Sequence, residues 1–290
     1  MTKIFETNKH YQSNLAYGSS TLKRIHLKSI LHALESQYEE NESMVRGGAL
    51  HCTTLEPERF NLEYVMYPLG GPRRPSQKQI AAKNPSAETL SAIKFWKEFD
   101  LKHAGKSILT QADLDAVIGM KKALRNHKLA NTILHGGEAE YSYYVTDPRT
   151  GLPLKCRPDY VKNGCLFDLK TTMDASPIGF ARQVGNQAWH LQAAFYVDVY
   201  NMATGENVNE FYFIAVENKA PHAVMIHLAD EILLAEGRKA YMKCLDQLKD
   251  FQDRGGDPKV PNSMNYFGYP MEVNTLTVPS HFLKSKFDVA

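Results

Sequence analysis

The chain lacks the marks of several protein classes. Its cysteines form no CxxC pair and no Cys/His pair at zinc spacing, which argues against a zinc–thiolate or iron–sulfur site. We expect four buried, reduced thiols instead. They are Cys52, Cys156, Cys165 and Cys244. No GxxxxGK[ST] phosphate loop is present, so ATP hydrolysis is not indicated. No nucleophile-elbow pattern surrounds a serine, so Ser142, His190 and Asp198 do not form a persuasive hydrolase triad.

Long apolar runs and an excess of charge are missing too. No stretch approaches the ~18 apolar residues of a membrane helix, and the first residues lack the apolar part of a secretory signal. We therefore expect a cytoplasmic protein that contacts no membrane. The net charge is only +2, so an anionic partner must be met by local basic patches. A length of 290 residues with 43% hydrophobic side chains suits a substantial core.

The first 135 residues are predicted to be mainly helical. The apolar spacing predicts helices over 22–40, with Ser19 and Ser20 as plausible caps before it, and over 49–56, 88–105 and 112–134, the last capped by Thr110. Residues 68–87 are rich in proline, glycine and positive charge, which predicts an exposed, mobile loop. Its cations could contact DNA phosphates, although a purely solvated loop is an equally good interpretation. They are Arg73, Arg74 and Lys78.

Residues 136–255 change to a strand-rich pattern. The segments EYSYYVTD, LPLKCRPDYV and CLFDLKTT predict a three-stranded antiparallel meander. Helical spacing returns after Pro177, two further strands follow at 209–217 and 222–229, and a long amphipathic helix precedes a tail at 256–290. Because no repeat or linker interrupts the chain, we expect one mixed α/β domain over 1–290, with a central mixed β-sheet flanked by helices and a helical N-terminal elaboration.

The segment RPDYVKNGCLFDLKTT (157–172) places two aspartates and a lysine in a predicted hairpin. Asn163-Gly164 favours a type I′ turn, and this register sets Asp159 opposite Asp168, with Cβ atoms about 4.5–5.5 Å apart. Lys170 then points to the same side of the sheet. Because opposed carboxylates repel, the pair indicates a site for a divalent cation such as Mg²⁺. The alternative is a solvated strand edge without function.

This pattern resembles the metal-binding motif of the PD-(D/E)XK nuclease superfamily, which implies a restriction-endonuclease-like core. The chain is similar to the RecE-type (exonuclease VIII) branch in SSTLKRI, GGALHCTTLEPERF, TGLPLKCRPDYV, DLKTT and QAAFY. The resemblance implies that Asp159 and Asp168 coordinate Mg²⁺ or Mn²⁺ with the Leu169 carbonyl. It further implies that Lys170 acts on the attacking water and that His51 is an additional ligand. Taken alone, His51 would be an ordinary core or surface histidine.

Three further positions follow from the same resemblance. Gln192 and Tyr196 form a QxxxY pair on one helical face, similar to a family motif beside the active site that helps to hold DNA. An amphipathic helix that merely exposes a Gln and a Tyr is the alternative. Glu140 resembles an acidic position found ahead of the first strand, and Glu138 is the alternative residue for that role.

The resemblance implies a metal-dependent exonuclease that digests duplex DNA ends 5′ to 3′ and leaves 3′ single strands for recombination by annealing. It also implies a homo-oligomer, expected as a tetrameric ring, a RecT-like annealing partner, and a bacterial host, phage or prophage source. Two alternatives remain at this point. One is a structure-specific or endonucleolytic deoxyribonuclease of the superfamily, and the other is a catalytically silent module that binds DNA ends.

Overall fold

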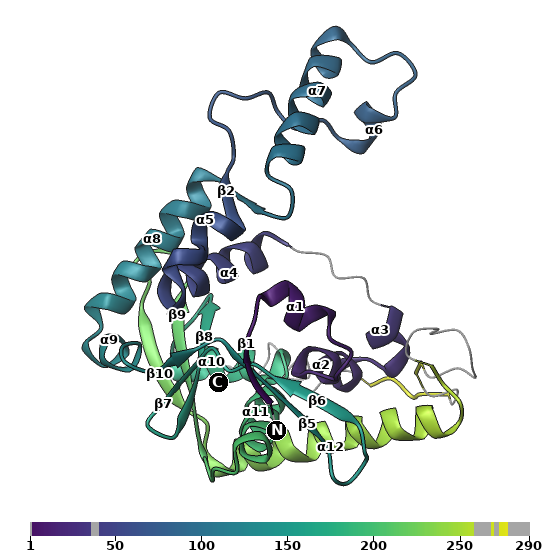
Figure 1. Ribbon diagram of the computed structural model, residues 1–290, viewed down its shortest axis with the longest axis vertical. Coiled ribbons are helices and arrows are strands. Elements are labelled where there is room, and N and C mark those ends of the chain that lie inside the picture. Colours follow the sequence, from purple (N-terminus) through teal and green to yellow (C-terminus); the bar gives the residue numbers. More distant parts are fainter. Residues whose placement is uncertain (1, 36–40, 258–267, 270–272, 278–290) are drawn as a thin grey trace, which may run out of the picture.

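The main sheet contains five strands in the order β10-β9-β8-β7-β4. It belongs to a computed structural model that describes residues 2–35, 41–257, 268–269 and 273–277 (Figure 1). β8 and β9 run parallel and the other neighbours run antiparallel, so the predicted mixed sheet within an α/β fold is confirmed. The strands are β4 (Glu138–Ala139), β7 (Tyr160–Lys162), β8 (Cys165–Thr172), β9 (Glu210–Glu217) and β10 (Val224–Leu228).

A second, antiparallel sheet has the order β1-β5-β6. Its strands are β1 (Thr2–Phe5), β5 (Tyr141–Thr146) and β6 (Pro153–Cys156). The predicted three-stranded meander is therefore wrong, because the stretch expected to form its middle strand divides between the two sheets. The division falls at Arg157-Pro158, where proline has no N–H to donate and restricts the preceding residue. β1, from the first five residues, was not predicted.

The hairpin between β7 and β8 has the predicted turn. Asn163 and Gly164 both adopt positive φ, at 51° and 72°, and Tyr160 pairs with Phe167 as expected. The ladder ends there, so the strict Asp159–Asp168 cross-strand pair does not form. Asp159 instead lies one residue before β7, and its Oδ2 accepts a hydrogen bond of 2.7 Å from the Leu169 backbone N–H.

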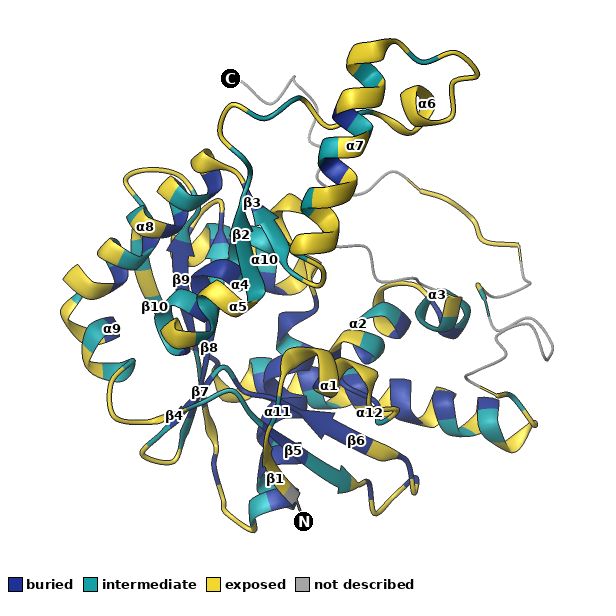
Figure 2. Ribbon diagram, turned by 45° about the horizontal axis from the view of Figure 1, so that its top comes forward, coloured by how far each residue is buried: buried dark blue, intermediate teal, exposed yellow. Residues whose placement is uncertain are grey.

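The helices cover both faces of the main sheet. α11 lies centrally, with most of its side chains buried against α2, α12 and the second sheet (Figure 2). α4 and α8 pack together over a separate hydrophobic cluster against the opposite face.

The helices outside residues 68–106 are α1 (Asn8–Ser13), α2 (Ser19–Leu27), α3 (Ile30–Glu35), α4 (Glu42–Leu55), the 3₁₀ turn η1 (Pro57–Arg59), α5 (Phe60–Glu63), α8 (Gln111–Asn126), α9 (Lys128–Ile133), α10 (Pro177–Asn186), α11 (Trp189–Thr204) and α12 (Glu231–Asp253).

Two predicted helices are broken by local capping. The helix expected over 22–40 ends at Leu27, and Ser29 starts α3 by accepting a hydrogen bond from the His32 N–H. The helix expected over 112–134 ends at Asn126, where the His127 ring accepts the Ala130 N–H and begins α9. Gly18 caps α2 in place of the predicted serines. The predicted Thr110 cap is confirmed, with Asp113 completing a capping box. Residues 36–40 lie outside the described residues.

Residues 68–106 form an arm that projects from the core (Figures 1 and 2). Two short parallel strands frame its base, β2 (Tyr64–Met66) and β3 (Ser107–Leu109). The arm contains α6 (Gln77–Ile80) and α7 (Ala87–Lys102), so the segment 68–87 is exposed as predicted but includes a helix. Ser76 and Gln79 cap α6 reciprocally, which explains why this turn forms.

Three cysteines are buried as predicted, and Cys165 is half-buried. None of the described helices combines the length and the apolar character that crossing a membrane requires. The division of 1–290 into a helical part, a catalytic core and a tail stays a prediction. Segments from the first 135 residues take part in the core, since β1 pairs with β5 and α2 packs on α11. Much of the predicted tail lies outside the described residues.

Candidate active site

Three side chains from separate parts of the sequence form a cluster of metal-ligating groups. His51, Glu140 and Asp159 each offer one ligand atom, and these atoms all lie within 4.8 Å of one another. His51 Nδ1 lies 3.4 Å from Asp159 Oδ2 and 4.0 Å from Glu140 Oε1. His51 Nε2 lies 2.6 Å from the Leu169 carbonyl oxygen. The predicted residues His51, Asp159 and Leu169 are thus brought together, and Glu140 rather than Glu138 joins them.

Local backbone features position this cluster. His51 lies on α4, which packs on β8, and Asp159 follows the break at Pro158. Glu140 adopts a left-handed φ of 57° between β4 and β5, and its N–H donates 3.2 Å to the Asp159 carbonyl. A left-handed conformation is costly for glutamate and persists only where surrounding contacts hold it. Glu138 is exposed and pairs with Lys3 instead.

Asp168 lies beside this cluster, though it is not one of its members among the described residues. It is buried in β8, and its Oδ1 accepts a hydrogen bond of 2.7 Å from Gln192 Nε2. The Lys170 ammonium lies 2.5 Å from Asp168 Oδ2, without hydrogen-bond geometry, and 5.3 Å from the centre of the Trp189 ring. Asp168 Oδ2 therefore keeps acceptor capacity in a buried position.

Lys23 is a member of this network that the sequence did not reveal. Its ammonium donates 2.9 Å to Gln192 Oε1, so the amide links Lys23 to Asp168. Burial, with a smaller contribution from the nearby Lys170 ammonium and against the opposing aspartates, lowers the pKa of Lys23 to about 8. In the sequence Lys23 is distinguished only by its position directly after Leu22, which is buried in α2.

Arg157 was also missed, although it directly precedes the Pro-Asp pair. It is 6% exposed, and its Nε lies 2.7 Å from Glu140 Oε2. Its Nη1 has no hydrogen-bond partner among the described residues. A cavity of about 250 Å³ opens at this point. Its lining includes Tyr64, Glu140, Arg157, Asp159 and Tyr196. A buried arginine that lines such a cavity and keeps an unpaired Nη1 suits a phosphate.

The carboxylates and the histidine shift one another's proton affinity. Burial raises the pKa of Asp159 to about 7, with the Asp168 carboxylate adding to this rise and His51 opposing it. Burial acts to lower the pKa of His51, but the Asp159 and Glu140 carboxylates outweigh it and raise that pKa to about 9. Bringing several carboxylates into a buried site is costly unless positive charge accompanies them.

The residues present fit a divalent cation. Carboxylate and carbonyl oxygens are the ligands that Mg²⁺ and Mn²⁺ prefer. The buried Asp168 Oδ2, which faces the Lys170 ammonium at 2.5 Å, is a further candidate oxygen. His51 Nε2 and the Leu169 carbonyl now bond to each other, so both can ligate one ion only after this hydrogen bond opens.

The remaining predicted residues have different surroundings. Tyr196 is buried one turn after Gln192 and lines the cavity. Arg73, Arg74 and Lys78 lie on the arm and take no part in the cluster. Arg74 is tied to the arm itself, since it pairs with Asp100 and stacks over Trp96 at 4.5 Å.

Comparisons with known proteins agree with this fold. A candidate exonuclease from Eubacterium rectale matches with a TM-score of 0.57 and 13% identity, over 98% of this chain and 99% of that chain. An alkaline exonuclease from Laribacter hongkongensis matches with a TM-score of 0.26 and 13% identity, over 61% of this chain and 89% of that chain. The sequence has no match among curated proteins. The family model described as a PDDEXK-like domain of unknown function (DUF3799) matches residues 19–269, and the chain therefore belongs to this family.

Proposed function

We propose that this protein is a metal-dependent exonuclease of the RecE-type branch that digests duplex DNA from an end, 5′ to 3′, and leaves 3′ single strands. The observation that carries the proposal is the convergence of His51, Glu140 and Asp159 next to the Asp168–Lys170 pair. Paired carboxylates with an adjacent lysine suit hydrolysis of a phosphodiester assisted by a metal ion. The polarity and the action from an end rest on the resemblance alone.

Mg²⁺ is the proposed ion, with Mn²⁺ as a substitute, held by Asp159 and Asp168 with His51, Glu140 and the Leu169 carbonyl as further ligands. Once bound, it would polarise the scissile phosphate and lower the pKa of a water. Asp168 is kept in one orientation by the Gln192 amide. Such support of a ligand by a neighbouring hydrogen bond fixes its geometry before the ion arrives.

The cationic side chains around the site act on the substrate. Lys170 lies within reach of Asp168 and would orient the attacking water while its charge stabilises the transition state. Arg157 lines the cavity with an unpaired Nη1 and would bind a phosphate oxygen there. Tyr196 lines the same cavity and would contact the DNA end.

The biological setting is proposed from the resemblance as well. We expect a homo-oligomer in the form of a tetrameric ring, a RecT-like annealing partner that receives the single strand, and a cytoplasmic location in a bacterial host, with a phage or prophage gene as the source. The structural match to a protein described as a candidate exonuclease is consistent with the activity.

The experiment compares linear with covalently closed circular duplex DNA, in Mg²⁺ and in EDTA, for the wild type and Asp168→Asn. Digestion of the linear form alone, lost in EDTA and in the variant, supports the proposal. Cutting of closed circles would instead establish an endonuclease. Tight binding of ends without hydrolysis in any metal would establish a silent end-binding module, and either result overturns the proposal.

A further inference from the structure

The arm holds much of the positive charge of the molecule. Residues 68–106 contain eight Lys and Arg against three Asp and Glu, a net charge of +5. The other 251 residues contain 26 and 29, a net charge of −3. The modest overall charge of +2 therefore conceals a basic arm on an acidic body.

Most of these cations are free to meet a partner. Arg74 pairs with Asp100 and Lys106 donates to the Asn61 carbonyl, so both help to hold the arm together. The others are exposed and form no ion pair with any residue that the structure describes. They are Arg73, Lys78, Lys83, Lys94, Lys97 and Lys102.

The arm has its own small core and packs little on the rest of the chain. Trp96 is 3% exposed and contacts Tyr67, Phe95 and Phe99 through ring packing. The Trp96 indole N–H donates 2.9 Å to the Pro72 carbonyl, which fixes the loop before α6 against α7. These contacts make the arm an ordered projection that displays its cations in fixed places.

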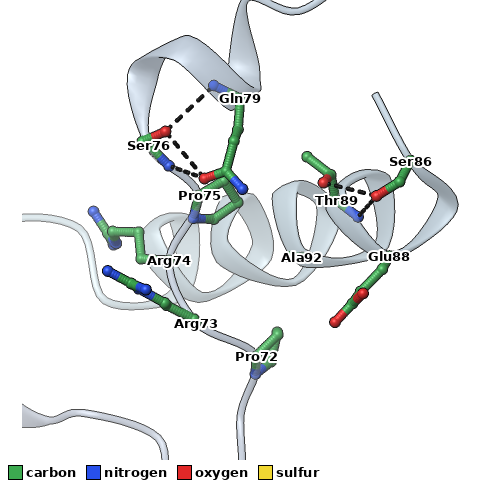
Figure 3. A pocket seen from close by; sticks show the side chains of 10 residues that line it. All are labelled: Pro72, Arg73, Arg74, Pro75, Ser76, Gln79, Ser86, Glu88, Thr89 and Ala92. Carbon is green, nitrogen blue, oxygen red and sulfur yellow. Dashed lines mark hydrogen bonds between the residues drawn. The ribbon is translucent and has the colours of Figure 1, made fainter. Parts of the chain in front are cut away.

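A polar cavity of about 530 Å³ lies where this loop meets α7. Arg73 and Arg74 extend to the same side of the loop in Figure 3, and the Ser76 and Ser86 caps line the other parts of the cavity. Glu88 is the acidic group within its lining. Guanidinium groups beside serine hydroxyls are typical contacts of the DNA backbone.

The base of the arm adjoins the candidate active site. Tyr64, the first residue of β2, lines the same cavity as His51 and Asp159. Gly48 on α4 leaves room for it, since a Cβ at Gly48 would lie 2.7 Å from the Tyr64 hydroxyl oxygen. DNA that enters the catalytic cavity would therefore pass the origin of the arm.

We propose that the arm binds the sugar-phosphate backbone of the duplex outside the catalytic cavity, through Arg73, Lys78, Lys83 and the exposed lysines of α7. This inference rests on the proposed nuclease function. The arms of two copies would repel each other, because each carries a net charge of +5. α7 alone spans about 24 Å at about 1.5 Å per residue, so the arm engages DNA well beyond the scissile bond.

The test measures duplex binding in EDTA as a function of salt for the variant Arg73→Gln/Lys78→Gln/Lys83→Gln. The matched control removes three exposed lysines elsewhere, in Lys219→Gln/Lys239→Gln/Lys243→Gln. On a 30-base-pair duplex we expect the arm variant to bind more weakly, with a log–log salt slope shallower by about 3, since each lost phosphate contact removes about one unit. The control should change the slope by less than about 1.

A second substrate separates this inference from the proposed function. A hairpin with a six-base-pair stem, about 20 Å long at about 3.4 Å per base pair, offers fewer phosphates outside the catalytic cavity than the long duplex. The arm variant should therefore lose less activity on this hairpin than on the long duplex. Unchanged binding of the long duplex by the arm variant, with normal cleavage, overturns only the inference. If the arm variant changes the oligomer mass but keeps the salt slope of the wild type, the arm contacts a second copy of the chain. This result also overturns the inference. Wild type that neither binds nor cleaves overturns both.

A second arm variant guards against failure to fold. Lys94→Gln/Lys97→Gln alters α7 alone, at exposed positions away from the Trp96 core. The log–log salt slope of duplex binding should be shallower than that of the wild type by about 2. A slope equal to that of the wild type, in a variant with a normal circular dichroism spectrum, contradicts a role for the arm in DNA binding.

Discussion

Gln192 holds Asp168 by a hydrogen bond of 2.7 Å from its Nε2 to the carboxylate Oδ1, while its own Oε1 accepts from Lys23 at 2.9 Å. Both residues are buried, so the orientation of the amide is fixed at both ends. α2 and α11 are thereby coupled to β8 at the candidate metal site.

Substitution of Gln192 tests this coupling. Gln192→Met should lower the rate of DNA hydrolysis and the affinity for Mn²⁺ by about 10–100-fold, the usual cost of removing a group that orients a metal ligand. Gln187→Met alters an exposed glutamine at the end of α10 and serves as the control. Rates and Mn²⁺ titrations are measured on both. Equal rates in the two variants contradict the positioning role.

Lys170 should act on the reaction more than on binding. Lys170→Met removes the charge beside Asp168, and we expect kcat to fall by about 10²–10³-fold or more, the range for one group that stabilises transition-state charge. Duplex affinity in EDTA should change little, because other cations remain. A variant that loses binding but keeps kcat would show that Lys170 only anchors DNA.

The lowered pKa of Lys23 predicts that DNA binding depends on pH. The ammonium has a pKa of about 8 and is charged below that value, so duplex affinity should fall as the pH rises from 7 to 9. The charged groups that act on it are Lys170, Asp168, Arg24 and Asp159. Lys23→Arg should reduce this step, because arginine stays protonated while His51, with a pKa of about 9, still titrates. The same step in Lys23→Arg and wild type would assign it to another group.

The contribution of Lys23 to protein stability should rise with pH, whereas its contribution to DNA affinity should fall. Its pKa in the folded state is lower than the ordinary lysine value, so the unfolded chain binds more protons between about pH 8 and 10.5. This one group therefore adds stability as the pH rises through that window. Lys23→Met should raise Tm at pH 7, by about 2–4 °C for each kcal/mol gained, while lowering DNA affinity. A lower Tm would show that the lysine is structurally required.

Substitution of Gly237 tests the packing of α12 against α11. A Cβ at this position in α12 would lie 2.0 Å from the His190 carbonyl oxygen, so Gly237→Ala should destabilise the fold by about 1–3 kcal/mol. Gly185, in α10, is the matched control, because a Cβ there meets nothing within 4 Å. Gly185→Ala should stabilise by about 0.5–1 kcal/mol. Denaturant unfolding measures both, and equal stabilities would contradict the packing.

The sequence predicted those features whose causes are local. Asn163 and Gly164 adopt the positive φ angles that the predicted turn requires. This two-residue turn sets the register in which Tyr160 pairs with Phe167. Thr110 was recognised as a cap because its partner lies three residues away. The placement of Lys170 beside Asp168 followed from strand alternation.

Other features depend on contacts between distant segments and could not be read from spacing. β1 is a strand because β5 pairs with it, and β2 pairs with β3 across the whole arm. Lys23 looked like an ordinary helix residue until α11 placed Gln192 next to it. The expected middle strand was wrong because the chain leaves the first ladder after Cys156, near Pro158, and joins the other sheet at Tyr160.

The central claim is that one metal ion binds between α4 and the β7–β8 hairpin. Crystals of the protein soaked in Mn²⁺, at a concentration that saturates binding in calorimetry, give the anomalous signal of the ion directly. We predict a peak in coordination contact with Asp159 and with at least one of His51, Glu140 and Asp168, absent in Asp159→Asn. A Mn²⁺ peak bound by other residues, with none at Asp159, would contradict the claim.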